Sequence, residues 1–198
     1  MMMRSDVPAL MPLVPHPANA SGDYRVDVGL GFGDDGRWQL TYAVAGAIGE
    51  LVLPMSKGGG GGRNGGGATP LRRDGLWQAS CFELFVRTGA RGYHEWNFAP
   101  HGDFALYAFD DYRTPVTPPP PTVPPVIIAD APDPDRSFTC RVSVDVAPFA
   151  GDGVLSVGIS AVMERADGGR DYWALAHPPG PPDFHAPACF AATILPPA

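Results

Sequence analysis

The sequence predicts an all-β domain, an antiparallel β-sandwich of the jelly-roll or immunoglobulin-like kind. Glycine and proline contribute 25 and 24 of the 198 residues, and both disfavour long helices. Apolar residues make up 44% of the chain and charged residues only 18%, which is enough to form a packed core. Apolar and polar side chains alternate in short runs, and residues typical of turns separate these runs.

The first strands are expected after a short lead-in. Prolines break the apolar stretch at the N-terminus, so residues 1–12 are expected to be an extended lead-in and residues 13–198 a single domain. Asp34-Asp35-Gly36 is typical of a turn between two alternating runs. Residues 58–67 are nearly all glycine and predict a flexible loop within the domain. In this half, strands are expected at residues 24–32, 38–44, 48–53, 80–87 and 93–98.

The second half continues the same pattern. Residues 114–125 contain seven prolines and predict an extended, polyproline-like connection. Residues 165–169 are expected to form a hairpin turn. Strands are expected at residues 104–110, 126–129, 138–146, 155–163, 171–176 and 190–195.

Charge and cysteine content narrow the class of protein. The formal net charge of −7 argues against a nucleic-acid partner, and no apolar run approaches the roughly 20 residues that a membrane span needs. The three cysteines are too few and too dispersed for a disulfide framework, so we expect buried thiols in a reducing compartment. A cytoplasmic location is therefore predicted, with the periplasm as the alternative; the oligomeric state stays open.

One hairpin allows a prediction of register. An odd number of loop residues places Arg87 opposite Tyr93, and residues 83 and 85 then face residues 97 and 95. Glu83, Glu95 and Asn97 would share one face of the sheet. The opposite, core-facing side would carry Phe82, Leu84, Trp96 and Phe98. Two carboxyl groups, an amide and nearby aromatic rings on one sheet face suit the binding of a polyol.

Five segments in order look like the motifs of bacterial DOMON-like proteins. Residues 76–85 (LWQASCFELF) are similar to the LW-x-x-x-CFE-x-F signature of that group. The other matching segments are 13–17 (LVPHP), 93–100 (YHEWNFAP), 104–113 (FALYAFDDYR) and 172–178 (YWALAHP) followed by 182–185 (PDFH). The resemblance implies a sandwich related to DOMON domains and to family 9 carbohydrate-binding modules, which bind haem or sugars.

The resemblance also implies roles for individual residues. Trp77 matches the first of two tryptophans that clamp a sugar in the related modules, and Trp173 is the candidate for the second wall. Trp77 could equally cover the end of the sandwich. Glu83 lies in an otherwise apolar strand, so it is expected either to pair with Arg113 or to bind a ligand hydroxyl. Tyr107 lies on the matching aromatic strand.

A polar group near the C-terminus completes the candidate site. His177, Asp183 and His185 lie in a proline-restricted loop, where they are expected to be preorganised for hydrogen bonds. Their spacing matches no compact metal motif, so no metal site is predicted. Haem is the alternative cofactor, with a histidine and Met163 as conceivable axial ligands, although Met163 lies on an apolar stripe.

The sequence therefore predicts a non-catalytic domain that binds a carbohydrate or sugar-derived metabolite. No nucleophile-elbow, phosphate-loop or dinucleotide-binding motif is present, and no cofactor is expected in this interpretation. A haem- or metal-binding domain with a redox or sensing role is the alternative, and a module that docks onto another protein is a third. The predicted ligand-binding residues are Trp77, Glu83, Glu95, Asn97, Tyr107, Arg113, Trp173, His177, Asp183 and His185.

Overall fold

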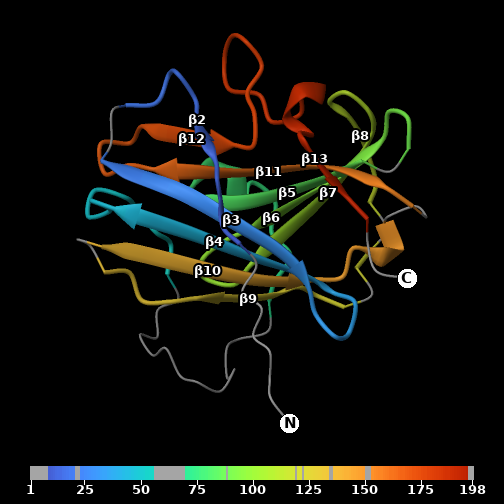
Figure 1. The fold of residues 1–198 in the computed structure, drawn as a ribbon, viewed down its shortest axis with the longest axis horizontal. Helices are drawn as coiled ribbons and strands as arrows, with labels where there is room; N and C mark the ends of the chain where they lie inside the picture. Colours follow the sequence, from blue (N-terminus) through green and yellow to red (C-terminus); the bar gives the residue numbers. More distant parts are fainter. Residues whose placement is uncertain are drawn as a thin grey trace.

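The protein folds as two antiparallel β-sheets packed face to face, as predicted (Figure 1). This computed structural model describes residues 9–20, 23–55, 70–87, 89–118, 120–121, 123–133, 136–149 and 153–195. Helix is confined, in these ranges, to the 3₁₀ turns η1 (Leu76–Gln78), η2 (Ala147–Phe149) and η3 (Pro187–Cys189). No helix among them is long and apolar enough to cross a membrane.

The smaller sheet has five strands in the described ranges, in the order β1-β3-β4-β10-β9. Its two longest strands form a hairpin across the Asp34-Asp35-Gly36 turn, where Gly36 has a positive φ of 76°. The strands are β1 (Met11–Pro12), β3 (Tyr24–Phe32), β4 (Trp38–Gly46), β9 (Val126–Ala129) and β10 (Ser137–Val144).

The larger sheet carries the candidate site. Within the described residues its order is β2-β12-β11-β5-β6-β7-β8, and β13 pairs with β11. Its strands are β2 (Val14–Pro15), β5 (Cys81–Arg87), β6 (Tyr93–Phe98), β7 (Phe104–Asp111), β8 (Thr114–Val116), β11 (Leu155–Glu164), β12 (Arg170–Ala174) and β13 (Ala192–Ile194).

The core fills the space between the sheets. Trp38 and Trp96 are buried there, as predicted, and Tyr42 stacks on Phe82 with ring centroids 4.6 Å apart. The Tyr42 hydroxyl donates a 2.8 Å hydrogen bond to the backbone carbonyl of Glu83, which links the two sheets directly. The three cysteines are buried free thiols, also as predicted.

Some strand boundaries differ from the prediction. The apolar run 48–53 forms only an isolated bridge, between Leu51 and Arg165, while Ile48 is buried in the core. Residues 114–116, expected in the polyproline-like connection, pair with β7 as β8. The glycine-rich segment 58–67 lies outside the described residues, as does most of the lead-in; Met11 and Pro12 pair with β3.

The predicted register of the β5–β6 hairpin is confirmed. Arg87 lies opposite Tyr93, Phe85 opposite Glu95, and Glu83 opposite Asn97. Because side chains alternate between the faces of a strand, the three polar residues share the outer face of the larger sheet. Phe82, Leu84, Trp96 and Phe98 belong to the core on the inner face.

Candidate functional site

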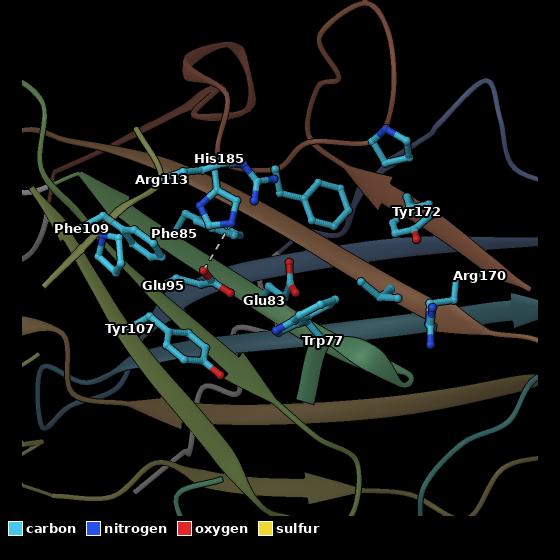
Figure 2. Close-up of a pocket in the computed structure, with 14 residues that line it drawn as sticks. Trp77, Glu83, Phe85, Glu95, Tyr107, Phe109, Arg113, Arg170, Tyr172 and His185 are labelled. Carbon is cyan, nitrogen blue, oxygen red and sulfur yellow. Dashed lines mark ion pairs between the residues drawn. The ribbon is translucent and has the colours of Figure 1, made fainter. Parts of the chain in front are cut away.

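The outer face of the larger sheet holds a cavity of about 390 Å³ (Figure 2). That volume lies in the range of about 300–1,000 Å³ that is usual for small-molecule sites. The cavity draws on β5, β6, β7, β11 and β12 and on the loops at their ends. Its lining consists of Trp77, Glu83, Phe85, Glu95, Tyr107, Phe109, Arg113, Pro115, Val162, Arg170, Tyr172, Pro182, Phe184 and His185.

A second, smaller aromatic cluster closes one side of this cavity. The loop after β12 brings Phe184 against the sheet, where Phe184 joins Phe85, Tyr93 and Val162 in a buried group. Phe85 and His185 meet edge to face, with ring centroids 5.5 Å apart. A sheet face that would otherwise meet solvent is therefore partly covered, and polar groups on its floor are shielded from water.

Glu83 is one of two carboxyl groups on the cavity floor. Only 2% of the residue is exposed, and its Oε2 accepts a 2.8 Å hydrogen bond from the Ser160 hydroxyl on β11. Burial is the main cause that raises the pKa of this carboxyl above its ordinary value, followed by the nearby charge of Glu95. The Ser160 hydrogen bond opposes the rise only in part.

Glu95 is the second carboxyl group, and Asn97 holds it in place. The amide Nδ2 of Asn97 donates a 2.7 Å hydrogen bond to Oε1 of Glu95. Glu95 is 5% exposed, and burial raises the pKa of its carboxyl despite the opposing effects of Asn97 and Arg113. Asn97 itself does not line the cavity, so its part is to orient Glu95.

A chain of hydrogen bonds positions His185 above Glu95. The backbone N–H of Arg113 donates to the Tyr93 hydroxyl at 3.1 Å, and that hydroxyl lies 2.8 Å from Nδ1 of His185. When the Tyr93 hydroxyl donates its hydrogen bond to Nδ1, the neutral imidazole carries its own proton on Nε2. This Nε2 lies 3.7 Å from Oε2 of Glu95, the dashed line in Figure 2. Burial lowers the pKa of His185 to about 4, so the ring is neutral near pH 7.

Arg113 pairs with Asp183, which corrects the expected pairing with Glu83. The guanidinium donates to Asp183 at 2.8 Å, and the Tyr112 hydroxyl donates to the same carboxylate at 2.6 Å. These two hydrogen bonds contribute to a pKa of Asp183 below its ordinary value. Asp183 does not line the cavity; it fixes Arg113, which does.

Trp77 stands at the rim of the cavity with half of its surface exposed. It lies in η1, which follows Gly75, a residue with a positive φ of 79° that glycine adopts easily. The backbone N–H of Gly75 donates a 2.8 Å hydrogen bond to the Tyr107 hydroxyl. Tyr107 therefore lines the cavity and also secures the turn that presents the indole. In Figure 2, Trp77 and Tyr107 lie below the two carboxyl groups.

Trp173 is not the second wall of the cavity. It pairs with Ala161 and points into the core, where it is 6% exposed and its Nε1 donates to the Tyr24 hydroxyl at 3.3 Å. Its neighbour Tyr172 faces the cavity instead, since adjacent residues of a strand point to opposite faces. The sequence match identified the right strand but the wrong face.

His177 also lies away from the cavity. Its Nε2 contacts the backbone carbonyl of Val14 at 2.9 Å, and its ring meets that of His16 edge to face. His177 therefore ties the C-terminal loop to β2 and does not converge with Asp183 and His185.

Several lining residues escaped the sequence analysis. Phe85 is not one of them, since the register of the β5–β6 hairpin already predicts it on the face of Glu83. The parity that places Tyr107 on the outer face also places Phe109 there, so Phe109 could have been found by extending the argument along its strand. Phe184 could not, because no sequence signal tells how the loop after β12 folds back over the sheet. Arg170 lies on β12 two residues before Tyr172 and shares its face, so the two were missed together. The missed residues are Phe109, Pro115, Val162, Arg170, Tyr172, Pro182 and Phe184.

His185 and Met163 are one conceivable axial pair for haem. Met163 is fully buried in the core on the inner face, whereas His185 lies on the outer face of the same sheet. The two residues therefore do not form an axial pair. In the described part of the chain, no group of three histidine, cysteine or acidic residues is arranged to hold a metal ion.

Solved structures of other proteins share this fold. The sequence matches no protein-family model and no curated protein. One similar structure is "a putative carbohydrate-binding protein" from Bacteroides uniformis, with 17% identity and a TM-score of 0.52 over 91% of this chain and 83% of that one. Another is a family 9 carbohydrate-binding module from Caldicellulosiruptor kristjanssonii in complex with glucose. It has 9% identity and a TM-score of 0.53, over 86% of this chain and 76% of the module's chain. At these identities the likeness establishes the fold.

Proposed function

We propose that this protein is a non-catalytic domain that binds a carbohydrate or a sugar-derived metabolite in the cavity on its larger sheet. The observation that carries the proposal is the cavity itself, in which a half-exposed indole stands at the rim and two buried carboxyl groups form the floor. An aromatic face packs on the C–H groups of a sugar ring, and carboxyl groups bind its hydroxyls.

Each group then has a defined part in binding. Trp77 covers one face of the ring, and Tyr172 forms a wall at another side of the cavity. Glu83 and Glu95 accept hydrogen bonds from hydroxyls, or donate them when protonated. Asn97 and Asp183 orient Glu95 and Arg113 and do not contact the ligand.

The wider assignment of the chain is part of the same proposal. We place it with the bacterial DOMON-like proteins on its five ordered motifs, as a single cytoplasmic domain over residues 13–198. Likeness to a carbohydrate-binding module supports a role in binding rather than in catalysis.

Isothermal titration calorimetry with a panel of mono- and disaccharides tests this function. We expect saturable binding of at least one sugar, and a loss of affinity of about tenfold in Tyr172→Ala, which removes a wall of the cavity. Phe32→Ala is the matched control, because Phe32 is a partly exposed aromatic residue on β3 in the other sheet. The proposal fails if no sugar binds, or if Tyr172→Ala and Phe32→Ala bind the sugar equally well.

A further inference from the structure

The two carboxyl groups on the cavity floor lack a positively charged partner. Glu83 makes no ion pair with any described residue, and its carboxyl accepts a hydrogen bond from the neutral Ser160 hydroxyl. The titratable group within ion-pair distance of Glu95 among the described residues is His185, at 3.7 Å, and that ring is neutral near pH 7. Arg113 lowers the pKa of Glu95 but makes no ion pair with it. Burying a carboxylate without a cation is costly, so the site as it stands holds an uncompensated negative charge or an extra proton.

The arginines that line the cavity compensate for this charge only in part, through the effect of Arg113 on the pKa of Glu95. Arg113 donates to Asp183 at 2.8 Å, so its charge is already matched. Arg170 is exposed at the start of β12, and its Nε donates to the backbone carbonyl of Gln78 at 2.9 Å. Neither arginine makes an ion pair with Glu83 or Glu95 in the described part of the protein.

The remainder of the lining is rich in aromatic rings. Ring faces attract cations, and they do so most strongly where water is excluded. A group that fills this space is therefore bordered by aromatic rings and by the carboxyl oxygens on the floor. The rings are those of Trp77, Phe85, Tyr107, Phe109, Tyr172 and Phe184.

We propose that the ligand carries a protonated amine, so that the site prefers an amino sugar to the matching neutral sugar. This inference rests on the proposed function, since it specifies the class of sugar that the same cavity takes. An ammonium group supplies the missing positive charge and donates up to three hydrogen bonds, which the oxygens of Glu83 and Glu95 accept. A neutral sugar would leave the carboxyl pair uncompensated.

The raised pKa values of both carboxyl groups agree with this arrangement. Burial keeps a proton on the pair in the unliganded protein. A bound ammonium group would cause the carboxyl pair to release that proton to solvent. The ammonium would then form the ion pair that the unliganded site lacks. Of the other charged groups around the pair, Arg113 is paired with Asp183 and His185 is neutral, so neither competes with the ammonium.

Calorimetry with two matched sugar series tests the inference. The probes are glucose, glucosamine and N-acetylglucosamine, together with the three corresponding galactose compounds, in an amine-free phosphate buffer near pH 7. In at least one series we expect the amino sugar to bind at least about tenfold more tightly than the neutral sugar, and the acetylated form to lose that advantage because its amide is uncharged. The double variant Glu83→Gln, Glu95→Gln should bring the affinity ratio of amino to neutral sugar to about one.

Controls separate this inference from the proposed function. Asp130→Asn removes an exposed carboxylate that pairs with Arg141 on the other sheet, and this variant should keep the preference. Equal affinity for amino and neutral sugars would overturn the inference and leave sugar binding intact. A preference that survives in the double variant would also overturn it, because the carboxyl pair would not be its source. Failure of every sugar in both series to bind would overturn the proposed function and the inference together.

Discussion

Replacing Trp77 with alanine removes the one tryptophan that stands at the rim of the cavity. Half of this residue is exposed, and η1 has no buried residue, so the side chain contributes little to the packed interior. The variant should therefore fold with a stability close to that of the wild type. Any loss of sugar affinity then reports on contact with the ligand.

The expected loss follows from the surface that a ligand would cover. An enclosed tryptophan buries about 150–250 Å² of surface, so the exposed half of Trp77 presents about 75–125 Å², of which a sugar ring would cover roughly 50–100 Å². At about 25 cal/mol per Å², this contact contributes about 1–2.5 kcal/mol. Trp77→Ala should therefore raise the dissociation constant about 5- to 70-fold.

Titration calorimetry with the tightest-binding sugar measures this change, and thermal unfolding of the same sample checks the fold. Phe32→Ala again serves as the control, with an unchanged dissociation constant expected. If Trp77→Ala binds the sugar as the wild type does while folding normally, the indole has no part in binding. Trp77 would then serve only to cover the end of the sandwich.

Two further predictions concern stability. A pKa of Glu83 that is higher in the folded than in the unfolded state makes the wild type lose stability as pH rises from about 4.5 through that raised pKa. Glu83→Gln should remove the part of this loss that Glu83 causes, while the part due to Glu95 stays. The variant should therefore gain about 1–3 kcal/mol relative to the wild type between acidic and alkaline pH. Urea unfolding across that range measures it, and parallel pH profiles for the two proteins would contradict it. Trp173→Ala should lower the free energy of unfolding by about 3–5 kcal/mol, because it empties a core position and removes a hydrogen bond to Tyr24; a change below about 1 kcal/mol would argue against its place in the core.

Tyr172, and not the predicted Trp173, lines the cavity, because adjacent residues of a strand point to opposite faces of the sheet. Both residues belong to a segment that resembles a known motif, and the larger tryptophan was the natural candidate for a sugar wall. On β12, however, Trp173 shares the inner face with the core, and Tyr172 takes the outer face. Only the pairing of β12 with β11 decides between them, because both residues are aromatic and the strand is short.

Local patterns were sufficient for the architecture and for the floor of the site. Alternating apolar residues and turn residues define most strands, and the odd loop between β5 and β6 determines that Glu83, Glu95 and Asn97 share a face. These features depend on neighbours in the chain or on one hairpin, so the amino-acid order specifies them directly. The pairing of Arg113 with Asp183, the position of His185 above Glu95 and the roof supplied by Phe184 join segments about 70–100 residues apart. Such contacts depend on how loops pack over a completed sheet, a choice made by the whole tertiary structure and not by any local pattern.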